Sequence, residues 1–89
     1  MTIDALTNDL LRVRPRGWSV TRSGDSLSVR PPDRNRCKFS VSFLSDGRLS
    51  VGRFDRTLNH WTGFEYIEPS ALNADALFEH LQRRTEGDG

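Results

Sequence analysis

The sequence has very little cysteine and no long hydrophobic run. Its single cysteine, Cys37, excludes a disulfide within the chain and suits a reducing compartment. No apolar run approaches the roughly 18–20 residues of a membrane-spanning helix, and the first residues carry Asp4 and Asp9 where a signal peptide is basic. We therefore expect a cytoplasmic protein with no membrane segment.

The sequence also lacks the motifs of common catalytic and metal sites. It has no Cys-x-x-Cys or His-x-x-x-His spacing and no glycine-rich phosphate loop. Thiol catalysis would require Cys37 to meet His60 or His80, and Cys37 begins the apolar side of an alternating segment, where thiols are usually buried and inert. We therefore expect no catalytic residue, no metal and no cofactor, and a protein that is not an enzyme.

The length of 89 residues fits one domain with a thin core. Eight aromatic residues supply the bulk that such a core needs, so we expect a folded chain rather than a disordered one. We expect a single domain over residues 1–84 and a frayed tail over residues 85–89.

Two segments carry the spacing of amphipathic helices. Apolar residues from Ile3 to Val13 recur every three or four positions, with Thr2 as the N-cap and Pro15 as the stop. A second stripe over residues 77–81 predicts a C-terminal helix that ends near Arg84. Its predicted N-cap is Asn73, with a hydrophobic staple between Leu72 and Leu77, and Ser70 is the competing cap.

Between the helices, the hydrophobic pattern alternates as in β-strands. Residues 18–30 and 37–51 predict two hairpins, with turns at Ser23–Ser26 and Asp46-Gly47, and residues 61–67 predict a fifth strand or an extended loop. Phe54 reaches the buried face only if the strand skips a residue, and Gly52 is the least costly place for such a bulge. The expected fold is α+β: an N-terminal helix, a four- to five-stranded antiparallel meander and a C-terminal helix, with both helices on one sheet face.

This fold assigns alternate strand residues to the helices and to solvent. The residues expected to face the helices are Val20, Leu27, Val29, Phe39, Val41, Phe43, Leu49 and Val51. The opposite face then shows small hydroxyl side chains and cations: Ser19, Thr21, Ser28, Arg30, Lys38, Ser40, Ser42, Arg48 and Ser50. Such a face is either merely solvated or a flat docking surface on which Arg30, Lys38 and Arg48 pair with acidic groups.

Charge is distributed unevenly along the chain, whose net charge is +1. Residues 1–56 carry eleven Lys and Arg against six Asp, and residues 57–89 carry two Arg against six acids, so the two parts hold +5 and −4. Arg34 and Arg36 of the basic loop 30–36, and the arginines 12, 14 and 16, could extend the basic face. A chain with such opposed charges could also form a homodimer.

Trp61 lies in the most aromatic stretch, residues 60–66. Strict alternation would keep Trp61 off the strand face of Phe64 and Tyr66, so one of these groups must point away from the core. Trp61 then either folds back over a core edge or serves as an interface anchor.

We expect a small non-enzymatic regulator or inhibitor that docks on an acidic surface of a larger assembly, protein or nucleoprotein, and blocks it. The expected contact residues are Arg30, Arg34, Arg36, Lys38, Ser40, Ser42, Arg48 and Trp61. The small size suits a phage or mobile-element protein, and a cellular adaptor would look the same. Direct nucleic-acid binding is the alternative. Against it are a pI of about 8.0 and a face that is expected to lack exposed stacking aromatics.

Overall fold

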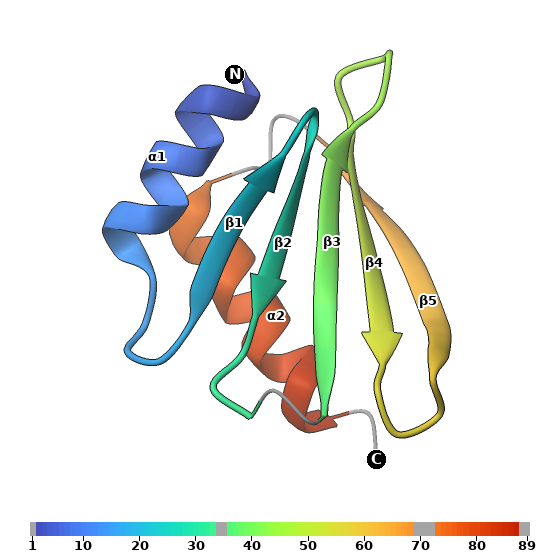
Figure 1. The fold of residues 1–89 in the computed structure, drawn as a ribbon. Helices are drawn as coiled ribbons and strands as arrows, with labels where there is room; N and C mark the ends of the chain where they lie inside the picture. The colour runs from blue at the N-terminus through green and yellow to red at the C-terminus, as the bar shows by residue number, and fades with distance from the viewer. Residues whose placement is uncertain (1, 34–35, 69–72, 88–89) are drawn as a thin grey trace.

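The computed structural model describes residues 2–33, 36–68 and 73–87 of the chain. In chain order the elements are α1 (Ile3–Val13), β1 (Ser19–Ser23), β2 (Ser26–Arg30), β3 (Cys37–Phe43), β4 (Leu49–Asp55), β5 (His60–Ile67) and α2 (Ala74–Gly87). The strands form one antiparallel sheet in the order β1-β2-β3-β4-β5; in Figure 1, α2 crosses behind the sheet and α1 lies beside β1. The predicted α+β meander is confirmed, with residues 61–67 as part of a fifth strand.

The first helix begins and ends at the residues that the sequence indicates. The hydroxyl of Thr2 accepts a hydrogen bond from the Ala5 N–H at 3.1 Å, which satisfies a donor of the first turn. Arg14, next to Pro15, has an extended ψ of 135°, because a residue before proline disfavours the helical conformation. Leu6 and Leu10 are buried.

The second helix starts at the predicted cap and runs past its predicted end. Asn73 Oδ1 accepts from the Ala76 N–H at 2.8 Å, which confirms the cap, whereas Ser70 and Leu72 lie outside the described residues. The helix continues to Gly87. In this last part the buried Thr85 donates to the Leu81 carbonyl at 2.9 Å. Neither described helix is long and apolar enough to cross a membrane.

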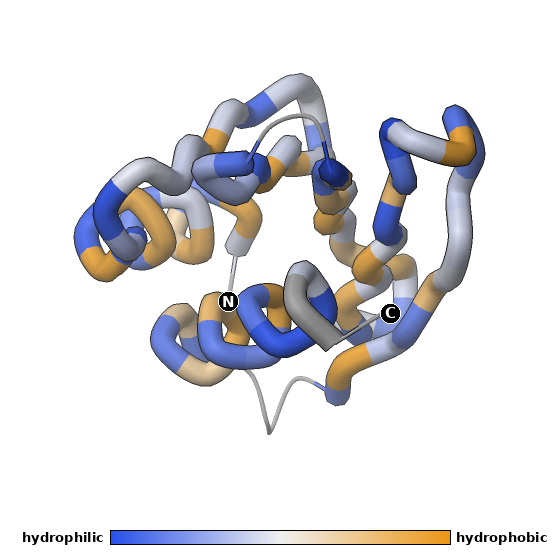
Figure 2. Tube along the Cα trace, turned by 90° about the horizontal axis from the view of Figure 1, so that it is seen from below, coloured by the Kyte–Doolittle hydropathy of each residue, from blue (hydrophilic) through white to orange (hydrophobic). Residues whose placement is uncertain are grey.

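The core fills the space between the helices and the sheet. Figure 2 shows the helices and the sheet from below, with hydrophobic and hydrophilic residues alternating along them. At its centre Trp18 stacks on Phe39 with ring centroids 6.5 Å apart and meets Phe78 edge-on at 5.5 Å. All eight residues expected to face the helices belong to this core or pack against it: Val20, Leu27, Val29, Phe39, Val41, Phe43, Leu49 and Val51.

The prediction of a bulge at Gly52 is wrong, and so is the buried position of Phe54. The β3–β4 register is unbroken from Phe43–Leu49 to Cys37–Asp55, so β4 skips no residue. Arg53 therefore faces the helices, where it is 3% exposed, and Phe54 faces away from them. The irregularity lies one strand further on. Arg53 pairs with Gly63 and Phe54 pairs with Trp61, which leaves Thr62 as the extra residue of a bulge in β5.

Candidate functional site

The sheet has one face that neither α1 nor α2 covers, which we call the open face. The register places fifteen strand residues on it: Ser19, Thr21, Ser23, Ser26, Ser28, Arg30, Lys38, Ser40, Ser42, Ser50, Gly52, Phe54, Trp61, Phe64 and Tyr66. None of these fifteen residues is acidic. The strand residues predicted for this face lie on it: Ser19, Thr21, Ser28, Arg30, Lys38, Ser40, Ser42 and Ser50. Ser23 and Ser26, predicted as turn residues, join them.

Four aromatic side chains gather on the β4–β5 half of the open face, and we call them the aromatic cluster: Phe54, Trp61, Phe64 and Tyr66. Trp61 meets Phe54 edge-on at 5.3 Å and stacks on Phe64 at 5.8 Å with an interplanar angle of 28°. Trp61, Phe64 and Tyr66 are 42%, 63% and 58% exposed. The expectation that this face lacks exposed stacking aromatics is therefore wrong.

The bulge at Thr62 explains why Trp61 shares a face with Phe64 and Tyr66, against the prediction from alternation. In a regular strand, residues 61 and 64 point to opposite faces, and one extra residue between them restores the same face. The Thr62 hydroxyl lies 3.1 Å from Nη1 of Arg53 and 3.4 Å from the Arg53 carbonyl, so contacts to β4 hold the bulge. Trp61 does not fold back over the core.

Gly52 provides the space in which the aromatic cluster lies against the sheet. A Cβ at this position would stand 2.8 Å from the Phe64 ring and 3.2 Å from the Trp61 ring. Any larger residue would require these rings to move. The glycine thus allows two rings of β5 to lie over the backbone of β4.

Arg53 ties the bulge to the β4–β5 turn from the helix-facing side. Its Nη1 donates to Thr62 and, at 3.2 Å, to Asp55. The pKa of the Asp55 carboxyl lies below its usual value, first because the carboxylate accepts the Leu58 N–H, and then through Arg53 and the Thr57 N–H. One carboxylate therefore orders both the turn and the buried guanidinium.

Two cations lie directly over rings of the aromatic cluster. Lys38 Nζ is 5.3 Å from the centroid of Phe54, and the Arg48 guanidinium carbon is 5.1 Å from the centroid of Tyr66. Arg48 is oriented by Asp46, whose Oδ2 accepts from its Nε at 2.7 Å. The pKa of Asp46 is lowered by the hydrogen bond from the Arg48 N–H and by that from its side chain. Gly47, with φ of 90°, makes the predicted turn beside them.

The remaining predicted cations lie in different places. Arg36 is exposed just before β3, and Arg34 lies outside the described residues. Arg12 pairs with Asp9 on α1, at 3.0 Å, on the helix side of the sheet, so it is not part of the open face. Arg56 was not among the predicted contact residues; its N–H donates to the Arg36 carbonyl at 3.0 Å.

The register brings Cys37, Asp55 and His60 into one row across β3, β4 and β5. The row does not form a thiol–imidazole pair in the structure: the cysteine is fully buried, and His60 Nδ1 lies 3.3 Å from the Leu58 carbonyl. Asp55 binds the turn and Arg53 instead. No group of three metal-ligating side chains occurs in the described part of the chain.

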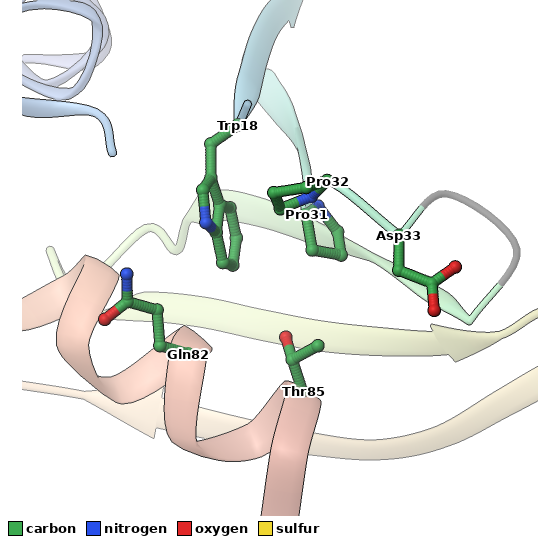
Figure 3. Close-up of a pocket in the computed structure, with 6 residues that line it drawn as sticks. All are labelled: Trp18, Pro31, Pro32, Asp33, Gln82 and Thr85. Atoms are coloured by element: carbon green, nitrogen blue, oxygen red, sulfur yellow. The ribbon is translucent and has the colours of Figure 1, made fainter. Parts of the chain in front are cut away.

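On the helix side, a hollow of about 390 Å³ opens between the β2–β3 loop and α2. Figure 3 shows Trp18, Pro31 and Pro32 along one wall and Gln82 and Thr85 of α2 along the other, with Asp33 at one end. The Thr85 hydroxyl is already bonded to the Leu81 carbonyl. The wall is mostly apolar, and it offers no cluster of charge like that of the open face.

A polar clamp fixes β5 to α2 behind the aromatic cluster. Glu65 Oε1 is 2.7 Å from Nη1 of Arg84, and its Oε2 is 2.8 Å from Nε2 of His80. Glu65 alternates with Phe64 and Tyr66, so the clamp holds the strand from one side while the rings project from the other.

Comparison with protein-family models, with curated proteins and with solved structures finds no match to this chain.

Proposed function

We propose that this chain is a non-enzymatic binding module that docks, through the open face, on an acidic surface of a larger assembly and regulates it by covering that surface. The supporting observation is the composition of the open face. It joins exposed aromatic side chains to cations, and none of its fifteen strand residues is acidic; just before β4, Asp46 pairs with Arg48. Aromatic residues and arginine are enriched in interface centres, where a few such residues supply most of the binding energy.

The two kinds of residue have different roles in this proposal. Lys38 and Arg48 attract acidic groups and set the dependence of association on salt. Trp61 and Phe64 bury apolar area and slow dissociation. The short serine side chains beside them, including Ser40 and Ser42, let a partner come close to the sheet.

The test is affinity capture by the tagged protein from a lysate of the organism that encodes it, before and after nuclease treatment. We compare the wild type with Lys38→Glu/Arg48→Glu on the open face. The matched control, Arg12→Glu/Arg83→Glu, reverses two exposed arginines of the helices. We expect one defined assembly to be captured by the wild type and the control and lost by the open-face variant. Equal capture by all three folded proteins would contradict the proposal.

A further inference from the structure

The end of the open face next to the β2–β3 loop holds four cations, which we call the cationic corner: Arg30, Arg36, Lys38 and Arg56. The β2–β3 register ends with Val29 opposite Phe39, so Arg30 and Lys38, the next residues of the two strands, adjoin on the open face. The bond from the Arg56 N–H to the Arg36 carbonyl continues the β3–β4 register one pair beyond Cys37–Asp55. Both arginines lie one residue outside β3 and β4, in turns, and strand alternation continued by this one pair would direct their side chains to the open face.

Each of these neighbouring pairs brings like charges together. Like charges directly opposite one another destabilise a sheet unless an anion lies between them. Asp33, the acidic residue of the same loop, lines the hollow on the helix side, where Figure 3 shows it. Asp55 faces the helices as well and binds Arg53 and the turn. The cationic corner is therefore suited to an anion with several charged groups.

A line of aromatic rings leads away from the cationic corner, first across β4 to β5 and then along β5. Phe54 and Trp61 lie beside Lys38 in one cross-strand row, Phe64 lies opposite Gly52 in the next, and Tyr66 opposite Ser50 in the third. The first and third rows are four residues apart along β4, which is about 13 Å at about 3.3 Å per residue. Arg48 stands over the last ring. A partner that follows this line meets cations, then rings, then Arg48 with its partner Asp46.

We propose that the open face binds single-stranded nucleic acid, with phosphates at the cationic corner and unpaired bases on the aromatic cluster. The inference rests on the proposed function, because it names the anionic partner of the same surface. Stacking of bases on aromatic side chains beside a cationic track is the general means of binding a single strand. Such stacking uses the faces of the bases, so RNA and DNA strands are both expected to bind.

The edge of β5 is a less suitable docking element than the open face. An edge strand accepts an added strand best when it is flat and regular, and a bulge or an inward-pointing charge prevents this. In β5 the bulge at Thr62 and the helix-facing Glu65, clamped by Arg84, provide both features. A partner is therefore directed to the rings on the face. A duplex is also a poor fit, because its bases are already stacked and paired.

The test measures binding of fluorescein-labelled oligothymidylate and oligouridylate of about 10 nucleotides by fluorescence anisotropy, in about 50 mM salt. We expect both strands to bind, and a duplex of the same length to bind at least about tenfold more weakly. Trp61→Ala/Phe64→Ala should weaken binding of the strands at least about tenfold, since it removes two rings on which bases stack. Tyr66→Ala removes a third ring and should also weaken binding of the strands. Arg12→Gln on α1 is the control and should bind like the wild type.

Two results would overturn this inference. One is no binding of either strand; the other is binding that the duplex shares and that survives loss of Trp61, Phe64 and Tyr66, since that would be electrostatic attraction alone. If the strands fail to bind while nuclease-treated lysate still yields an assembly that Lys38→Glu/Arg48→Glu loses, the partner is an acidic protein surface and the proposed function stands. If the strands bind through the rings but no assembly is captured, the inference holds and the regulatory role is wrong.

Discussion

The ring of Phe64 lies over the backbone of Gly52, so close that a Cβ on residue 52 would stand 2.8 Å from it. The two residues are cross-strand partners on the open face. The absence of a side chain in β4 thus decides how a ring of β5 is presented. It also provides a way to disturb the aromatic cluster without altering any of its rings.

We predict that Gly52→Ala keeps the fold and displaces the rings of Phe64 and Trp61. Phe64 is exposed and can rotate, so the cost in the free energy of unfolding should be about 1 kcal/mol, at the low end for added volume. Binding of oligothymidylate should fall severalfold, because the stacking surface is rearranged. Urea denaturation and fluorine NMR of fluorotryptophan-labelled protein measure the two effects, with the core residue Trp18 as the internal reference.

The control for this variant is Ser40→Ala, in the same cross-strand row as Gly52. It removes a hydroxyl and adds no volume beneath the rings. The Trp61 resonance should stay in place in this variant. A Trp61 resonance unchanged in Gly52→Ala as well would mean that the rings do not rest on residue 52.

The fold could be predicted from the sequence because its signals are local. Period-2 alternation, the Asp46-Gly47 turn and the caps at Thr2 and Asn73 act over a few residues, and each has the expected structure. The aromatic cluster could not be predicted in this way. It depends on Thr62 as an extra residue, and a bulge depends on pairing between strands rather than on a local motif.

The positions of Arg53 and Phe54 also depend on pairing between strands and could not be predicted from local sequence. The hydrophobicity of phenylalanine favoured the core for Phe54, yet the regular β3–β4 register places Arg53 there. Asp55 and Thr62 provide hydrogen bonds for the buried guanidinium. These partners of Nη1 come from β4 and from the β5 bulge, so the sequence alone did not reveal that a buried arginine could be paired at this position.

We predict that Glu65→Gln loosens β5 from α2. The substitution removes the charge that faces Arg84 and His80, and the half-exposed site should cost about 1 kcal/mol in the free energy of unfolding. Relative to the wild type, hydrogen exchange in Glu65→Gln should become faster at the amides of β5 and stay the same at those of β2. The matched control is Glu79→Gln, whose partner Arg83 is 3.9 Å away and exposed, and which should change stability very little. Equal effects of the two variants would show that the clamp adds nothing.

The lowered pKa of Asp55 predicts a specific loss of stability in acid. Its folded pKa lies below the unfolded value of about 3.9, so its contribution is complete above that value and is lost as the pH falls through the folded pKa. In Asp55→Asn this part of the pH dependence should be absent, and the variant should be less stable than the wild type at pH 7. Urea denaturation between about pH 2 and 7 measures both. Parallel curves for the two proteins would contradict the prediction.

The cationic corner predicts how binding of a single strand depends on salt. Each phosphate neutralised releases counterions, and for single strands the logarithm of the binding constant falls with the logarithm of salt concentration by about 0.7 per contact. Four contacts, from Arg30, Arg36, Lys38 and Arg56, give a slope of about −2.8. Arg36→Gln/Arg56→Gln should bring it to about −1.4, whereas Trp61→Ala should weaken binding at every salt concentration with the slope unchanged. One variant changes the slope with salt and the other changes the affinity at every salt concentration. A salt series of anisotropy titrations therefore separates the phosphate contacts from the stacking contacts. A slope that Arg36→Gln/Arg56→Gln leaves unchanged would mean that the phosphates bind elsewhere on the chain.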